Sequence, residues 1–255
     1  FDVASYCAEK ISHDEDGKYT ARLPWKDEHD PLPTNFAITQ ARTRSMVHRL
    51  DTDTLQLYDS IFRDQLRRQF IEAVQPDNQN QGHYIPHHGI KKDSATTPLR
   101  IVFDCSCSHN GKPSLNDCLE SGAPLLNDLV SILIRFRLYH SALSSDIEKA
   151  FLNVRLHELD RNYTKFLWLS DPANVNSEFL TYRFRSVLFG STSSPFILNA
   201  VLSKHLRKYS TTVANNISNN LYVDNLVTGV SGDHGTSVNQ RALQYYEESN
   251  QIMRN

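Results

Sequence analysis

Apolar residues recur every three to four positions in several stretches of this chain, which is the spacing that buries one face of a helix. The clearest stripe contains Leu55, Tyr58, Phe62 and Leu66. Helices are expected from Phe36, over Leu55–Phe70, from Leu129 to Phe136, over 194–209 and over 236–254. A polar residue just before each stripe should cap it, so we expect Thr52 or Asp53 to cap the second helix and Asn127 the third.

Short runs rich in β-branched and aromatic residues lie between these stripes and predict strands. The expected strands cover 83–92, 98–106, 141–147, 165–170 and 179–186, and the stretch NNLYVDNLVTG at 219–229 predicts a hairpin. Helices and strands mix without a regular βαβ alternation, which favours an α+β fold. Residues 12–35 are acidic and contain three Pro with little periodicity, so we expect an extended arm.

The predicted hairpin carries a bare carboxylate, Asp224, between Val223 and Asn225. Tyr222, Val223 and Leu226 favour a half-buried strand, whereas Asp and Asn favour a turn. On this stretch alone, a hairpin with a polar tip formed by Asp-Asn is a sufficient explanation.

A second isolated carboxylate, Asp146, ends the predicted strand at 141–147. Taken alone, it could be a cap at the end of the strand. Two strands that each deliver one carboxylate could instead form a site for divalent cations, because the cations neutralise the mutual repulsion of the carboxylates.

Composition narrows the class of protein. The 255 residues are 39% hydrophobic and 22% charged, with a net charge of −2, which is typical of an ordinary globular protein with only local basic patches. No apolar run approaches the ~20 residues that span a bilayer, so we expect no membrane partner. Four unevenly spaced Cys suggest a reducing compartment rather than a disulfide framework. The chain begins with Phe1 rather than Met, so we expect a piece of a longer protein.

Four motifs occur in an order that resembles the fingers and palm of a reverse transcriptase, most closely the BEL/Pao class of LTR retrotransposons. They are HYIPHHGIKK with TTPLRIVFDCS, then SLNDCLESGAPLLNDLVSILIRFRLYHSALSSDIEKAFLNV, then RFRSVLFGSTSSPFILN, then YVDNLVTG. The LPWK stretch at 23–26 is similar as well. The resemblance covers roughly residues 17–250. It implies an arm at 1–35, fingers at 36–113 and 154–192, and a palm at 114–153 and 193–255.

The resemblance implies an RNA-directed DNA polymerase that adds dNMPs to the 3′ end of a primer on an RNA or DNA template. Asp146 and Asp224 match the metal-binding aspartates, and the backbone carbonyl of Ile147 matches a further ligand. Two Mg²⁺ ions are the implied cofactors, with Mn²⁺ as the alternative. The implied location is the cytoplasm, including virus-like particles.

Nucleotide contacts follow from the same resemblance. Arg100 and one of Lys91 or Lys92 match the groups that grip the triphosphate, although Lys91-Lys92 could equally be a solvated turn. Phe151 matches the ring that excludes a 2′-hydroxyl, or it could be plain core packing.

The motif around Gly190 matches the region that approaches the nucleotide or template. Gly190 would permit close backbone approach there. Phe189 occupies a position where many retroviral enzymes carry Gln, so a polar contact to the nucleotide is expected to be missing.

Two departures from the family pattern matter. Asn225 stands where the hairpin's second Asp is expected, which removes a negative charge while leaving an oxygen that can bind a metal. The chain also stops about 30 residues after Asp224, so the thumb and the downstream peptidase, RNase H and integrase domains are expected to be missing partners. These departures keep open a decayed or domesticated polymerase fold that only binds nucleic acid or protein.

Other chemistry has weaker support in the sequence. His83, His87 and His88 lack the spaced Cys or third ligand of a zinc site. No Gly-x-Ser-x-Gly elbow, aspartic-peptidase triplet or phosphate-binding loop occurs. Peptidase and NTPase functions are therefore not supported.

Overall fold

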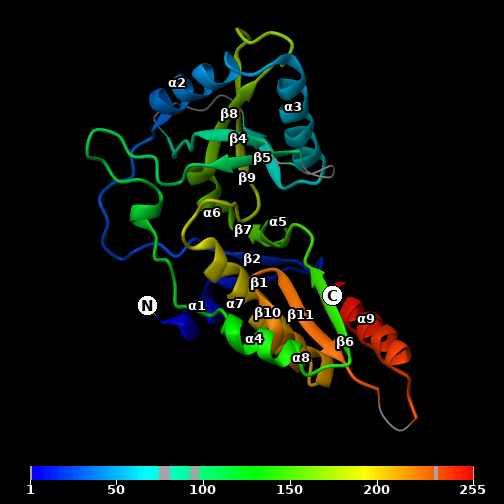
Figure 1. The fold of residues 1–255 in the computed structure, drawn as a ribbon. Helices are drawn as coiled ribbons and strands as arrows, with labels where there is room; N and C mark the ends of the chain where they lie inside the picture. Colours follow the sequence, from blue (N-terminus) through cyan, green and yellow to red (C-terminus); the bar gives the residue numbers. More distant parts are fainter. Residues whose placement is uncertain (1, 75–80, 92, 94–97, 233–234, 255) are drawn as a thin grey trace. The chain divides into compact units, whose positions relative to one another are not determined.

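A computed structural model describes residues 2–74, 81–91, 93, 98–232 and 235–254 of the chain. The chain divides into two compact units (Figure 1). Unit 1 comprises 20–122 and 151–194, and unit 2 comprises 2–19, 123–150 and 195–255. Both units are assembled from segments far apart in the sequence, so neither follows from one continuous stretch.

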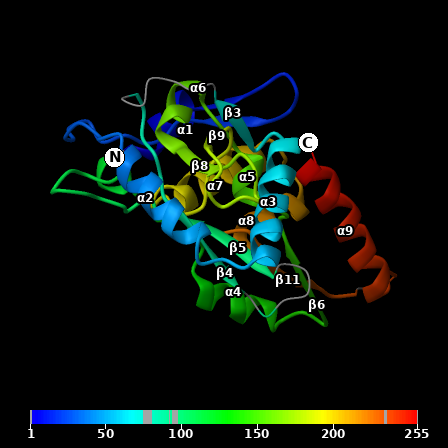
Figure 2. The same cartoon turned by 90° about the horizontal axis from the view of Figure 1, so that it is seen from above.

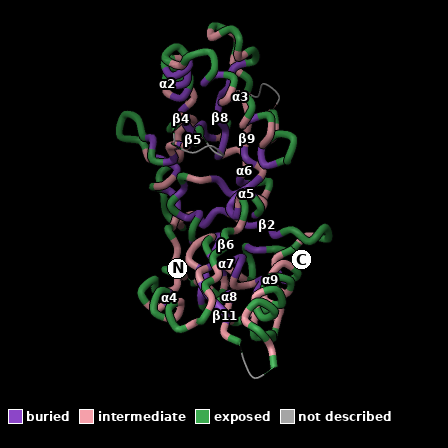
Figure 3. The backbone as a smooth tube through the Cα atoms, turned by 45° about the vertical axis from the view of Figure 1, so that its right-hand side comes forward, coloured by how far each residue is buried: buried purple, intermediate pink, exposed green. Residues whose placement is uncertain are grey.

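Unit 1 is built around two antiparallel β-structures. One is a three-stranded sheet in the order β3 (Ile71–Val74), β9 (Phe179–Phe184), β8 (Lys165–Leu169). The other is a hairpin of β4 (His87–Lys91) and β5 (Leu99–Phe103). Every residue of β8 is buried (Figure 3). The strand KFLWL therefore lacks the polar–apolar alternation of a half-exposed strand, as expected for one covered on both faces.

Helices α2 (Phe36–Val47) and α3 (Thr52–Arg67) pack against strands of unit 1. The unit also contains the short elements η1 (Asn116–Cys118), α5 (Ala150–Asn153, whose first residue falls in unit 2), α6 (Glu158–Arg161) and η2 (Asn162–Thr164). Helix α3 lies beside β5 (Figures 1 and 2). Its stripe of Leu55, Tyr58 and Phe62 is buried, which confirms the helix expected there.

An aromatic cluster around His87 forms the core of unit 1. Its rings belong to Tyr58, Phe62, Phe103, Phe166 and Trp168. The hydroxyl of Tyr58 lies 2.6 Å from Nδ1 of His87, and Nε2 of His87 lies 2.9 Å from the carbonyl oxygen of Leu167. Because that carbonyl only accepts, Nε2 carries the proton and Nδ1 accepts from Tyr58. Burial lowers the pKa of His87 to about 4, so this residue is a neutral core histidine.

The LPWK region is anchored by a buried carboxylate. Asp160, 1% exposed, accepts from Nε and Nη2 of Arg22 at 2.6 and 3.1 Å. It also accepts from the amide of Leu23 and from Nε1 of Trp25, each at 3.0 Å. Thr20 and Ala21 of β2 (Tyr19–Ala21) pair with β7 (Arg155–Leu156) just before this point. This part of the expected arm is thus held firmly within unit 1.

Unit 2 contains a three-stranded antiparallel sheet in the order β10 (Leu221–Tyr222), β11 (Asn225–Val230), β6 (Ser141–Asp146). Three helices contact β11, namely α4 (Leu129–Phe136), α8 (Thr212–Asn220) and α9 (Val238–Arg254). The unit also includes α1 (Val3–Glu9), β1 (Ile11–His13) and all but the first residue of α7 (Ser194–Leu206). None of the helices in the described part of the chain is long and apolar enough to cross a bilayer.

Each expected helix and strand has a counterpart, but the strand expected at 83–92 begins only at His87, and the helix expected to reach Phe70 ends at Arg67. Two caps also lie one residue from the predicted position. Asp51, not Thr52 or Asp53, caps α3 by accepting from the amide of Thr54, and Asp128, not Asn127, caps α4. Asn127 instead donates to the carbonyls of Ser218 and Leu221. Helices α1 and α8 and strand β3 were not predicted from the sequence, and neither were strands β1, β2 and β7 or the short helices α5 and α6.

Candidate active site

The hairpin at 219–229 forms, with its turn one residue earlier than predicted. Tyr222 pairs with Asn225, so Val223 and Asp224 are the two turn residues and Asn225 begins β11. The expected Asp-Asn turn is therefore wrong by one position. Val223 has a φ of 58°, a left-handed conformation that is strained for a β-branched side chain. Glycine is the usual residue at such a position in a two-residue hairpin.

The register of the sheet brings the two predicted carboxylates to the same end of β11. Asp146 pairs directly with Asn225, and the amide of Ile147 donates to the backbone carbonyl of Asp224 at 2.9 Å. Strands β6 and β11 lie side by side in Figure 1. Because residues directly opposite each other in an antiparallel pair share a face, the side chains of Asp146 and Asn225 are cross-strand neighbours.

Asn225 is bonded to the second carboxylate as well. Its Nδ2 donates to Oδ1 of Asp224 at 2.9 Å. Asp146 and Asn225 are exposed and Asp224 is half-buried. The side chain of Asn225 therefore lies opposite Asp146 and is hydrogen-bonded to Asp224. From the sequence alone, Asn225 was only the next residue along the turn.

These oxygen donors suit a hard divalent cation. Carboxylate, amide and backbone carbonyl oxygens are the ligands that Mg²⁺ accepts. The carbonyl of Ile147 accepts from the amide of Ala150 at 3.2 Å, and a carbonyl oxygen has a second lone pair for a further contact. No cluster of three or more His, Cys, Asp or Glu side chains with metal-binding geometry occurs among the described residues. A cation here would have two carboxylates, Asp146 and Asp224, as its charged ligands.

Three of the predicted nucleotide-binding residues come together within unit 1. The ring centroids of Phe151 and Phe189 are 4.6 Å apart, and the guanidinium carbon of Arg100 lies 5.5 Å from the centroid of Phe189. Phe151 is buried, Phe189 is half-buried and Arg100 is exposed. The half-buried ring of Phe189 thus contacts both the buried ring of Phe151 and the exposed guanidinium of Arg100. The rings could contact a sugar, and the guanidinium could contact phosphate.

Lys91 does not join this group. Lys91 pairs with Leu99 across the β4–β5 hairpin, while Arg100 pairs with Ile90. Because side chains alternate along a strand, Lys91 and Arg100 belong to opposite faces. Nζ of Lys91 instead lies 3.4 Å from the carboxylate of Asp51. Lys92 lies outside the described residues.

Gly190 is required by its own packing. Its φ is 107°, and a Cβ at this position would lie 2.2 Å from the carbonyl oxygen of Phe103 at the end of β5. Any larger residue would push the 189–192 turn off this strand. The sequence had suggested close approach to a nucleotide or template as the reason for this glycine, and the contact with Phe103 is a sufficient reason by itself.

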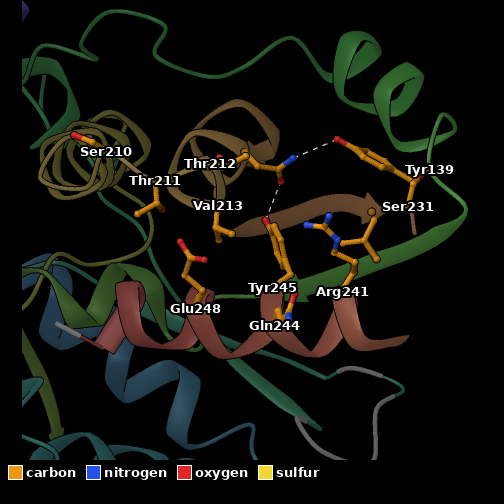
Figure 4. A pocket seen from close by; sticks show the side chains of 13 residues that line it. Tyr139, Ser210, Thr211, Thr212, Val213, Ser231, Arg241, Gln244, Tyr245 and Glu248 are labelled. Carbon is orange, nitrogen blue, oxygen red and sulfur yellow. Dashed lines mark hydrogen bonds between the residues drawn. The ribbon is translucent and has the colours of Figure 1, made fainter. Parts of the chain in front are cut away.

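A cavity of about 750 Å³ lies at the other end of β11, beside Gly229–Ser231 (Figure 4). Asn216 lies in the wall of this cavity. Its Nδ2 donates to the hydroxyl of Tyr139, and its Oδ1 accepts from the hydroxyl of Tyr245 at 2.8 Å. Burial raises the pKa of Tyr245 to about 12. Hydrogen bonds thus link Tyr139, Asn216 and Tyr245, and the cavity is not lined by Asp146, Asp224 or Asn225.

A strand that ends in one carboxylate, paired with a hairpin whose turn carries another, has the form of a nucleic-acid polymerase palm, and the mixed helix-and-sheet structure agrees with a palm-and-fingers fold. A model of the reverse transcriptase (RNA-dependent DNA polymerase) family matches residues 58–253. The chain therefore belongs to the reverse transcriptase family. No curated protein sequence matches it. Members of this family bind primer–template and dNTPs and use divalent metal ions.

Proposed function

We propose that this chain is the RNA-directed DNA polymerase part of a BEL/Pao-class retrotransposon polyprotein, active in the cytoplasm or in virus-like particles. The class is supported by the four motifs in order and by LPWK. The polymerase function is supported above all by one observation, the pairing of Asp146 with Asn225 beside Asp224. In such a polyprotein, a thumb, an RNase H, a peptidase and an integrase would be the companion domains.

Each residue of the proposed site has a distinct role. Asp146 and Asp224, with the carbonyl of Ile147, would hold two Mg²⁺ ions, whose chemistry is to lower the pKa of the primer 3′-hydroxyl and stabilise the leaving pyrophosphate. Asn225 orients Asp224 through its amide and offers Oδ1 as a weaker ligand than a carboxylate. The reaction joins the primer oxygen to the α-phosphorus of the dNTP and releases pyrophosphate.

The residues of unit 1 would select the nucleotide. Arg100 binds triphosphate oxygens through its planar guanidinium, which suits phosphate geometry. The ring of Phe151, held against Phe189, fills the space that a 2′-hydroxyl would need.

Primer extension tests the function. The natural polypeptide that contains these residues should extend oligo(dT) on poly(rA) with dTTP and Mg²⁺, and Mn²⁺ should serve as an alternative. Phe151→Ala should admit ribonucleotides, because bulk rather than a hydrogen bond excludes them. A folded protein that binds primer–template but extends it with neither metal would refute the proposal. Unchanged sugar selectivity in an active Phe151→Ala variant would assign the ring to the core alone.

A second candidate, a decayed polymerase fold that only binds nucleic acid or protein, is favoured by Asn225 in place of a carboxylate. It predicts binding of primer–template without extension. Measuring both quantities on one preparation separates the two candidates. With a net charge of −2, any such binding should be weak and should weaken further with added salt, because it depends on local phosphate contacts.

A further inference from the structure

Asn116 lies in the short helical turn η1 and uses every polar atom of its side chain. Nδ2 donates to Oγ of Ser106 at 2.9 Å and to the carbonyl oxygen of Gly190 at 3.2 Å. Oδ1 accepts from the amide of Thr192 at 3.0 Å. The backbone amide of Asn116 also donates to the carbonyl of Cys105 at 3.0 Å. One residue therefore ties the loop after β5 to the turn at 189–192.

The turn η1 provides a firm base for this contact. Leu115, just before the turn, and Cys118, its last residue, are fully buried, while Asn116 itself is only half-buried. The 189–192 turn is fixed from the other side by Gly190, whose Cα faces the carbonyl of Phe103 without room for a Cβ. With Gly190 held between Asn116 and the end of β5, the backbone of the preceding residue has little freedom.

That preceding residue is Phe189, which contacts both Phe151 and Arg100. A shift of the turn would therefore move the ring that packs against Phe151 and lies near the guanidinium of Arg100. Such a shift should weaken nucleotide binding more than the chemical step, because lost contacts that are equal in the ground and transition states raise KM without lowering kcat. Asn116 does not itself belong to this aromatic–cation group.

We propose that Asn116 is a positioning residue that fixes Phe189 and, through it, the places of Phe151 and Arg100 for the sugar and triphosphate of the incoming nucleotide. This inference rests on the proposed polymerase function. The role needs asparagine in particular, since the side chain must donate to the carbonyl of Gly190 and accept from the amide of Thr192 at once. An aspartate has the same shape but would set a carboxylate against the Gly190 carbonyl.

The test compares Asn116→Asp and Asn116→Ser with Asp117→Asn as the matched control. Asp117 is in the same turn, but its carboxylate accepts from the amide and hydroxyl of Ser114 rather than from the 189–192 turn. Steady-state extension should show a dNTP KM about tenfold higher for Asn116→Asp, with dNTP-over-rNTP discrimination several-fold lower. The kcat should change by less than about threefold. Asn116→Ser should fall between, and Asp117→Asn should match the wild type.

Amide hydrogen exchange gives a readout that does not depend on activity. The amide of Thr192 should exchange faster in Asn116→Ser than in the wild type, because the shorter serine side chain no longer brings an acceptor oxygen to this amide. It should stay protected in Asp117→Asn. If the wild type extends primers and Asn116→Asp leaves both KM and sugar discrimination unchanged, the inference about Asn116 is overturned while the polymerase function stands. If the folded wild type neither extends primers nor binds dNTP, the proposed function fails and takes the role of Asn116 with it. If Asn116→Asp does not fold, the KM and discrimination of Asn116→Ser decide.

Discussion

The aromatic cluster of unit 1 and the hairpin of unit 2 differ in the burial and hydrogen bonding of their polar groups. In the cluster, His87 is fully buried, neutral, and bonded through both ring nitrogens to Tyr58 and to the Leu167 carbonyl. At the hairpin, Asp146 and Asn225 are exposed, and Asp224 is only half-buried on a turn with a strained Val223. One region satisfies its polar groups within the fold, and the other leaves carboxylate oxygens available.

Because of this difference, the aromatic cluster contributes mainly to stability and the hairpin mainly to chemistry. Buried rings with a hydrogen-bonded polar centre stabilise a unit but offer nothing to a substrate. Exposed carboxylates on paired strands add little to stability but can bind cations. Substitutions in the cluster should therefore change unfolding and spare metal dependence, and substitutions at the hairpin should do the reverse.

The largest effect is expected at the carboxylates. Asp146→Asn or Asp224→Asn should lower primer extension by about 10³-fold, because the charge stabilisation lost is several kcal/mol. The free energy of unfolding should stay the same or rise slightly, since two neighbouring like charges become one. Ser145→Ala, next to Asp146 on β6, is the control and should extend normally. Retention of activity within tenfold in both Asp variants would mean that the hairpin is not the metal site.

The next largest effect is a loss of stability in acid through His87. Its pKa is about 4 in the folded chain against an ordinary value of 6.5, so the unfolded state binds more protons between these pH values. Stability is therefore fully present above pH 6.5 and is lost as the pH falls toward about 4, by about 3 kcal/mol. Unfolding can be followed by the fluorescence of Trp168, which stacks on Tyr58 with centroids 4.6 Å apart.

His87→Gln is the control for this pH dependence, because a glutamine can make both hydrogen bonds without titrating. Burial also lowers the pKa of His83 and His205, so the comparison is between the pH slopes of the variant and the wild type. The slope between pH 6.5 and 4 should be shallower in His87→Gln. Equal slopes would show that His87 does not control the acid stability of unit 1.

Sequence reasoning located the long elements and the two aspartates, because these depend on local signals. The apolar stripe of α3 and the carboxylate at the end of β6 can be read within a few residues. The aromatic centre of unit 1 was harder to predict. His87 was considered for zinc and set aside, but its burial among rings from α3, β5 and β8 depends on pairings of segments far apart in the chain.

The features that were missed depend on register or on distant partners. The turn of the hairpin shifted by one residue because the pairing of Asn225 with Asp146 places Asn225 in the strand. Helix α8 was not predicted because its Asn-rich sequence favours caps and turns. The burial of Ala214 and Ile217, which depends on tertiary packing, stabilises it as a helix. Asn116 lies 74 residues from Gly190, so nothing near it in the sequence suggested a role.

A smaller effect is expected at Asn225. Asn225→Asp would place a third carboxylate opposite Asp146 and replace the hydrogen bond to Asp224 with repulsion. Without metal, the free energy of unfolding should fall by about 0.5–1 kcal/mol. The Mg²⁺ concentration for half-maximal extension should fall several-fold, because a carboxylate is the stronger ligand. Asn225→Ala should raise that concentration. If Asn225→Asp leaves metal dependence unchanged or lowers activity, the amide's bond to Asp224 matters more than its oxygen.

The smallest effect on primer extension concerns the strain at Val223. A β-branched residue at a φ of 58° carries a cost of ~1–3 kcal/mol, part of which Gly would relieve while losing ~0.5–1 kcal/mol to its greater freedom when unfolded. Val223→Gly should therefore stabilise unit 2 by about 1 kcal/mol, measured by denaturant unfolding followed by amide exchange in β10 and β11. The gain should come with a less fixed Asp224 and a higher Mg²⁺ requirement for extension. Val223→Ala, which keeps a Cβ without the branch, should gain less than Val223→Gly. If Val223→Gly destabilises the chain more than Val223→Ala does, the packing of the valine side chain outweighs its strain. The hairpin would then be stabilised by side-chain packing, as the aromatic cluster is.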